Sequence, residues 1–290
     1  MNELAAKLPP RELEAIPVLG SGIGYRDPWF KALTGEEGQA ADFLEITADH
    51  FFDAPAWKLR ELDALTERFT LIPHALDLSL GTAEGLDECY LAKLASLVAR
   101  LSPPYWSEHL AFTKAGGREL GHLAPLPFSE EAVETVARNV KLARHYIDLP
   151  LALENVTYGF EMPGGEMDEA TFLTMVLEVS ECGWLLDVTN LYVNSVNHKR
   201  DPFSFLCATP MERVVQLHYV GFSIGKNGFL IDDHGADVDP QTRTLMEEVL
   251  RRCPAKGAIL ERDQNLPPFA KVAEEMAKTR EAGRKCGRWA

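Results

Sequence analysis

Six histidines and carboxylates follow short apolar runs along the chain, and their types are those that bind metal ions. Leu151-Ala152-Leu153-Glu154 and Trp184-Leu185-Leu186-Asp187 are two examples. A polar group at the end of a buried strand costs free energy unless it is paired or bound to a metal. Several bare imidazoles and carboxylates in one place would repel or neutralise one another without cations between them. The pattern favours a metal cluster built from His74, His109, Glu154, Asp187, His218 and Glu261.

Three further side chains extend this set of ligands to nine. Asn190 follows Asp187 by three residues, and Asp232 and His234 stand at i and i+2 in a later loop. On an extended segment such a pair projects from one side and can bind one ion. Nine nitrogen and oxygen donors suffice for two or three metals, and their mixture without thiolates suits catalytic Fe, Mn or Zn. The rival interpretation, an ion-pair network, would need more cations, and Arg262 is the only obvious one at a strand end.

Eight short apolar runs alternate with segments of helical spacing, which predicts the elements that position these ligands. Short runs without clean alternation are typical of parallel strands buried on both faces. Eight strand and helix units favour a single-domain (β/α)8 TIM barrel over residues 1–290, with short extensions at about 1–15 and 280–290. The alternative, an open dinucleotide-binding sheet, lacks a GxGxxG that opens a helix. The runs are 18–24, 42–47, 70–75, 105–111, 149–155, 184–188, 214–220 and 258–261.

The composition limits which classes of partner and which cellular compartment we expect for this protein. There are 29 Lys and Arg residues against 44 Asp and Glu, so the net charge is −15, which argues against nucleic acid as a partner. The five cysteines are scattered without a CxxC, so we expect no disulfide framework and a cytoplasmic location. We see no signal peptide and no apolar run long enough for a membrane span. No membrane partner is expected.

Seven motifs occur in order over about residues 20–265 and carry a family resemblance. They are PHALDLSLG (73–81), SEHLAF (107–112), LENV (153–156), LLDVTNLYVN (185–194), VQLHYVG (215–221), LIDDH (230–234) and LERD (260–263). They resemble the multinuclear non-haem iron-dependent oxidases, long grouped only as a domain of unknown function among the xylose-isomerase-like TIM barrels. The resemblance implies an enzyme with two or three iron ions and dioxygen as co-substrate. It would oxidise cysteine residues of a ribosomally made precursor peptide, together with a partner protein that binds the peptide leader.

The resemblance also assigns the nine ligands to three metals. One metal would be held by His74, His109 and Glu154, and Glu154 would bridge to the second. Asp187, His218 and Glu261 would complete the second site. A third, weaker site would use Asn190, Asp232 and His234.

Two positions depart from the family pattern, and four residues are candidates for supporting roles in catalysis. Many members have a second histidine four residues after His218, where this chain has Phe222. Many also have Glu-Asn where this chain has Asp49-His50, and we expect both departures to line the mouth of the barrel. His50 is a candidate acid or base, although it could equally be an ordinary loop histidine. With it we name Asp49 as catalytic, and Asn155 and Asp263 as orienters of the ligands.

Three other functions remain open from the residues. A trimetal hydrolase of the endonuclease IV kind, which cleaves phosphodiesters, would need nearly the same ligand order, but the acidic charge fits DNA poorly. A sugar isomerase or epimerase usually needs a lysine or a carboxylate pair near the metal, and no lysine ends a strand. A metal store would leave the mouth of the barrel unexplained.

Overall fold

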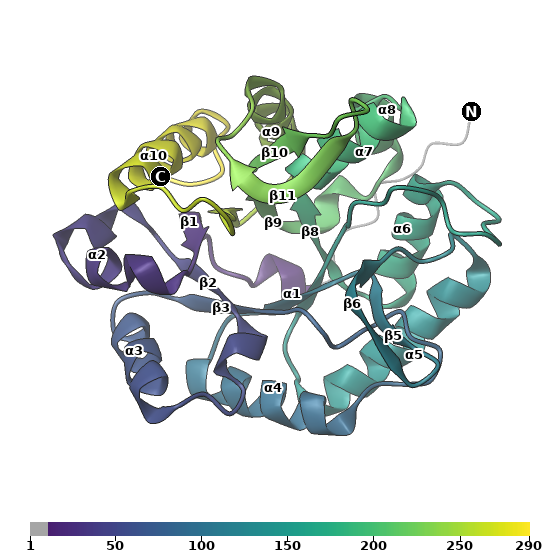
Figure 1. The fold of residues 1–290 in the computed structure, drawn as a ribbon, viewed down its shortest axis with the longest axis horizontal. Coiled ribbons are helices and arrows are strands. Elements are labelled where there is room, and N and C mark those ends of the chain that lie inside the picture. Colours follow the sequence, from purple (N-terminus) through teal and green to yellow (C-terminus); the bar gives the residue numbers. More distant parts are fainter. Residues whose placement is uncertain (1–10) are drawn as a thin grey trace.

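Eight parallel strands close into a barrel, which confirms the predicted (β/α)8 fold. The structure is a computed structural model that describes residues 11–290. Around the barrel the strands follow their order in the chain, and the first pairs with the last. Figure 1 shows the helices arranged around these central strands. The barrel strands are β1 (Gly20–Gly24), β2 (Leu44–Thr47), β3 (Leu71–Ala75), β4 (Trp106–His109), β7 (Leu151–Glu154), β8 (Gly183–Asp187), β9 (Val214–Tyr219) and β12 (Gly257–Leu260).

The helices form because their sequences combine an apolar stripe with a side chain that caps the first turn. Asp87 accepts hydrogen bonds from the amides of Cys89 and Tyr90, and Asp239 caps a helix that has Pro240 in its first turn. Five helices follow strands β3, β4, β7, β8 and β9 or their hairpins: α4 (Glu88–Leu101), α5 (Glu130–Tyr146), α6 (Glu169–Val179), α7 (Val188–His198) and α9 (Pro240–Arg252). The others are α1 (Arg11–Glu14), α2 (Phe30–Thr34), α3 (Ala56–Thr66), α8 (Pro202–Ala208) and α10 (Phe269–Lys285), with 3-10 turns η1 (Asp27–Trp29), η2 (Glu36–Ala40), η3 (Ala48–Phe51) and η4 (Met211–Arg213).

A largely apolar layer lies beneath the polar strand ends. Side chains two apart on a strand share a face, so Ile72 lies one layer below His74, and Leu185 one layer below Asp187. Ile72 and Leu185 belong to a buried cluster that Leu13 and Ile16 complete from the N-terminal segment. The histidines and carboxylates therefore lie above a packed layer that is largely apolar, with Glu45 and Gln216 as polar members in register with Ile72 and Leu185.

Two hairpins rise from the barrel where the sequence suggests connecting loops. Residues 114–122 belong to the hairpin of β5 (Phe112–Ala115) and β6 (Arg118–Ala124). Gly116 and Gly117 at its turn have positive φ angles of 59° and 67°, as such tight turns require. The second hairpin, β10 (Gly221–Ile224) with β11 (Leu230–Ala236), follows β9 and lies beside α7 (Figure 1).

The C-terminal segment is part of the barrel's outer layer. Residues 280–285, expected to start an extension, continue α10, and Arg280 pairs with Asp42. Trp289 is 7% exposed and packs on Gly283. The expected N-terminal extension lies mostly outside the described residues, although α1 falls within it. In the described part of the chain, no helix has the length and hydropathy to cross a membrane.

Candidate metal centre

The first group of ligands joins the ends of three neighbouring strands. His74 on β3, His109 on β4 and Glu154 on β7 are buried, and one donor atom of each lies within 4.8 Å of the others. The Nε2 atoms of the two histidines are 3.3 Å apart. Glu154 Oε2 is 3.4 Å from Nε2 of His74 and 3.6 Å from Nε2 of His109. Three donors that point at one another can hold one ion.

The second group shares Glu154 with the first. Glu154, Asp187, His218 and Glu261 bring one donor atom each within 4.8 Å of the others. Nδ1 of His218 is 3.5 Å from Glu154 Oε1 and 3.0 Å from Glu261 Oε2. Because Oε2 of Glu154 faces the first group and Oε1 faces the second, this carboxylate is placed to bridge two ions.

The third group differs in part from the expected one. His234 on β11 lies 2.7 Å from Asp232 through Nε2, while its Nδ1 is 3.2 Å from Asp263 and 3.6 Å from Glu261. His234, Glu261 and Asp263 converge within 4.8 Å, so Asp263, expected as an orienter, lies among the candidate ligands. The amide oxygen of Asn190 is buried without a hydrogen-bond partner and its side chain lines the same cavity as Asp232 and His234.

Unpartnered atoms among these residues fit bound cations. Buried polar atoms in proteins normally have a hydrogen-bond partner. Here Glu154 Oε2, Asp187 Oδ2 and Asn190 Oδ1 have none, although all three atoms are buried. Nitrogen and oxygen donors that converge without hydrogen bonds have the chemistry of a multinuclear metal site.

The electrostatics divide the histidines into two pairs. Burial lowers the pKa of His109 to about 4, and burial together with the neighbouring imidazoles holds the pKa of His74 well below its usual range. These two rings are therefore neutral and offer lone pairs. Burial also lowers the pKa values of His218 and His234, but the surrounding carboxylates outweigh it and raise both well above the usual range. The carboxylate-rich side of the cluster thus attracts positive charge.

Burial also shifts the pKa values of the carboxylates in the cluster. It raises the pKa of Glu154 to about 7 and that of Asp187 to about 8. Nearby cations favour the ionised form and would reverse both shifts. The cluster is therefore better satisfied with metal ions than without them.

Hydrogen bonds from neighbouring residues hold the ligands in place. Asn155 accepts from the backbone amide of Asp187 and from the indole of Trp184, and donates to the backbone carbonyl of Asp187. Asp187 uses Oδ1 to cap α7 through the amide of Asn190 at 2.7 Å, which leaves Oδ2 for the cluster. Asn155 thus contacts the backbone of Asp187, one of the candidate ligands, on both its amide and its carbonyl side.

Comparison with known proteins identifies the family. The family model described as "RiPP precursor modification enzyme MbnB/TglH/ChrH" matches residues 20–284. RiPPs are ribosomally synthesised and post-translationally modified peptides. The chain belongs to this family. The resemblance noted from the sequence motifs is thereby confirmed.

Curated relatives match nearly the whole chain, and solved structures share its fold. A UPF0276 protein of Caulobacter vibrioides is 34% identical over 274 residues, covering 94% of this chain and 95% of that one. One from Neisseria meningitidis is 35% identical, covering 92% and 98%. At the level of fold, 3-keto-D-glucoside 4-epimerase YcjR of E. coli matches with a TM-score of 0.57 at 11% identity, covering 90% and 98%. A xylose isomerase-like TIM barrel protein of Mycobacterium smegmatis, solved with magnesium, gives 0.55 at 11%, covering 94% and 98%.

His50 and Phe222, which stand at the two departures from the family pattern, do not line the mouth of the barrel. A mouth cavity of about 530 Å³ is lined by candidate ligands and by residues of β6 and β11. Among residues 11–290, neither His50 nor Phe222 lines it, contrary to expectation. Phe222 packs against Tyr192, and His50, in the short turn η3, lines a separate cavity with Arg26 and Lys58. Both side chains therefore lie outside the lining of the mouth cavity.

Asp49 also has a role that the sequence did not suggest. Its carboxylate accepts hydrogen bonds from the backbone amide of Leu76 at 2.9 Å and from the hydroxyl of Tyr90 at 2.8 Å. It thus ties the turn after β2 to the end of β3 and to α4. In this position Asp49 is a structural link beside the cluster and not a member of it.

Glu45 and Arg26 are polar residues at the cluster that sequence reasoning missed. Glu45 is 3% exposed and lies 2.9 Å from Nε2 of His218. Its signal was a carboxylate inside the apolar run Leu44-Glu45-Ile46, but it stands in the middle of a strand and not at its end. Arg26 donates to Asp263 through Nε at 3.0 Å.

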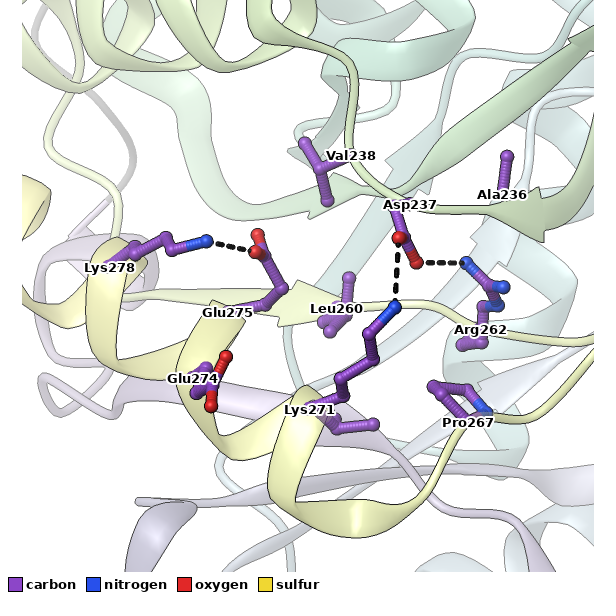
Figure 2. Close-up of a pocket in the computed structure, with 11 residues that line it drawn as sticks. Ala236, Asp237, Val238, Leu260, Arg262, Pro267, Lys271, Glu274, Glu275 and Lys278 are labelled. Atoms are coloured by element: carbon purple, nitrogen blue, oxygen red, sulfur yellow. Dashed lines mark hydrogen bonds and ion pairs between the residues drawn. The ribbon is translucent and has the colours of Figure 1, made fainter.

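A second cavity shows by contrast what a satisfied polar site looks like. It has a volume of about 210 Å³ and lies beside α10 (Figure 2). Asp237 is 3.2 Å from Lys271 and 3.6 Å from Arg262, and Glu275 pairs with Lys278 (Figure 2). These charges neutralise one another, unlike the unpartnered donors of the metal centre.

Proposed function

We propose that this protein is a multinuclear non-haem iron oxidase that uses dioxygen to modify cysteine residues of a ribosomally made precursor peptide. The observation that carries the proposal is the double use of Glu154, whose two oxygens face separate groups of buried donors. Membership of the RiPP-modifying family supports a peptide substrate. The cysteine chemistry and the iron follow from the family resemblance of the motifs.

The nitrogen and oxygen donors fit iron, and they fall into groups that would each hold one ion. His74, His109 and Glu154 would hold one ion, and Glu154, Asp187, His218 and Glu261 a second. A third would use His234 with Asp263 or with Asn190 and Asp232. Ferrous ions in such sites supply electrons and open coordination positions for dioxygen and a thiolate.

The protein itself would bind and orient the substrate. The mouth cavity, at about 530 Å³, has room for a peptide side chain, and β6 and β11 contribute to its wall. The neutral imidazoles of His74 and His109 keep their lone pairs for the metal, while Asn155 holds Asp187 in register. The packed layer around Ile72 and Leu185 excludes water from below.

A second protein is part of the proposal. The cavity accepts a side chain, whereas a leader segment needs a surface of its own, so a leader-binding partner would deliver the peptide. Both would act in the cytoplasm, where the five free cysteines of this chain remain reduced.

Reconstitution with defined metals tests the proposal. The chain is loaded with ferrous iron or with zinc under nitrogen and mixed with its candidate partner and the cysteine peptide encoded beside its gene. We expect oxygen uptake and a change in peptide mass with iron and air only, and neither with a Glu154→Ala variant. Equal turnover by the zinc form without oxygen would refute the oxidase, and phosphodiester cleavage would favour the hydrolase.

A further inference from the structure

A chain of three buried polar side chains lies against the far side of His218 from the metal groups. Glu45 comes from β2, Gln216 from β9 and Tyr105 from the segment before β4. Both oxygens of Glu45 are 2.9 Å from Nε2 of His218. The amide nitrogen of Gln216 contacts Glu45 and also lies 3.0 Å from the same Nε2. All are buried, so water does not compete for these contacts.

We propose that Glu45 is a positioning residue that keeps a proton on Nε2 of His218 when metal binds, so that Nδ1 is the nitrogen left free as the ligand. An imidazole can ligate only through a nitrogen that carries no proton, and the hydrogen bond of the other nitrogen selects the tautomer. Nδ1 is the atom that faces Glu154 and Glu261. The inference rests on the proposed metal centre and adds to it a residue outside the ligand set.

Gln216 competes with Glu45 for Nε2 of His218, and the two side chains favour opposite tautomers of the ring. Its amide nitrogen is a donor, and a donor beside Nε2 favours the form in which Nε2 accepts and Nδ1 carries the proton. Tyr105 donates to the amide oxygen, and the carboxylate of Glu45 repels that oxygen, so both neighbours fix the amide nitrogen toward His218. Without Glu45, the nearest neighbour of Nε2 would be this donor. The proton would then move to Nδ1 and block ligation.

The charge of Glu45 decides the competition in the present arrangement. A hydrogen bond to a carboxylate is roughly twice as strong as one between neutral groups. His218 therefore donates to Glu45, and Gln216 also donates to Glu45 rather than to the ring. His74 has a comparable support, since its Nδ1 lies 2.9 Å from the hydroxyl of Ser107 while Nε2 faces the first metal group.

Four variants test the proposal against a merely structural role. Glu45→Ala removes the acceptor, and Glu45→Gln keeps an oxygen without the charge. The double variant E45Q/Q216E exchanges the two groups and restores a carboxylate beside Nε2. The matched control is Glu108→Gln, since Glu108 is an equally buried carboxylate on β4 whose Oε2 has no hydrogen-bond partner.

Metal content and histidine nitrogen NMR of the zinc-loaded proteins are the readouts, and circular dichroism reports folding. Glu45→Ala should bind metal about 10- to 100-fold more weakly at the second site, with a His218 spectrum of the Nδ1-protonated form. Glu45→Gln should lose less, while the exchange variant and Glu108→Gln should match the wild type.

Each outcome bears on one claim. Wild-type affinity and an unchanged His218 spectrum in Glu45→Ala would overturn the inference. If Glu45→Ala does not fold, an exchange variant that folds but binds metal no better than Glu45→Gln would overturn it as well. A wild-type protein that binds no metal would instead contradict the metal centre itself.

Discussion

At the scale of single residues, Glu154 links the two best-formed groups of donors. Its two oxygens face different groups, at 3.4 Å from His74 and 3.5 Å from His218. A bridging carboxylate supplies a ligand to both sites at once, so its loss removes a donor from each. The remaining donors serve one group or, like Glu261, stand between the second and the third.

We predict that Glu154→Ala empties both metal sites, whereas His109→Ala empties only the first. The physical reason is that His109 contacts Glu154 and His74 but is not part of the second group. Elemental analysis after reconstitution and dialysis measures this as a larger loss of metal per chain in Glu154→Ala. Equal losses in the two variants would contradict the bridging role.

Asn155→Ala should reduce both metal affinity and stability. It leaves the backbone amide of Asp187 and the indole of Trp184 without partners. An unpaired buried donor costs about 1–3 kcal/mol, and loss of a supporting residue weakens metal binding about 10- to 100-fold. Urea unfolding and metal titration check the two effects. The control is Asn194→Ala, since Asn194 makes equally buried contacts with Val156 and Tyr158.

At the scale of elements, strand ends were predictable and mid-strand polar residues were not. An apolar run that ends in His74 or Glu154 predicts both that a strand forms there and that the polar side chain lies at the end of that strand. Glu45 gives no such signal, because its meaning depends on the distant Gln216 and His218. The hairpins were missed because β5, β6, β10 and β11 are partly exposed and contain no buried apolar run.

The direction in which a loop side chain points could not be predicted from the sequence either. His50 follows β2 just as other candidates follow their strands, yet the 3-10 turn η3 places it beside Lys58 and Arg26. Asp263 was expected to orient ligands and instead joins His234 and Glu261. Both results depend on turn geometry, which spacing alone does not determine.

Helix α4 offers a test of local stability that is independent of the metal. Asp87 accepts hydrogen bonds from two amides in its first turn. Asp87→Ala should lower the free energy of unfolding by about 1 kcal/mol, since a lost N-cap costs about that much. Chemical denaturation measures the change, and metal content should equal that of the wild type. A loss of metal in this variant would mean that α4 positions the cluster more directly than its contacts suggest.

At the scale of the whole molecule, the cysteine thiols differ in burial, and we therefore expect them to differ in reactivity. Burial raises the pKa of Cys253 to about 12 and also raises that of Cys182. A higher pKa leaves less thiolate, which is the reactive form, at neutral or mildly alkaline pH. Cys89 and Cys207 are exposed.

We therefore predict that alkylation at about pH 8 modifies Cys89 and Cys207 first and leaves Cys182 and Cys253 protected until the protein unfolds. Peptide mass spectrometry with and without denaturant identifies the labelled sites. Rapid labelling of Cys253 in the folded protein would contradict the packing of α9 against the barrel.

The central claim is that the mouth of the barrel gathers imidazoles and carboxylates to hold iron ions. Crystals of the protein reconstituted anaerobically with ferrous iron, measured on both sides of the iron absorption edge, test it most directly. The account predicts anomalous peaks between His74, His109 and Glu154 and between Glu154, Asp187, His218 and Glu261, with a weaker peak at His234, all of which fade below the edge. Maps without peaks, in which these side chains pair directly with one another, would contradict it.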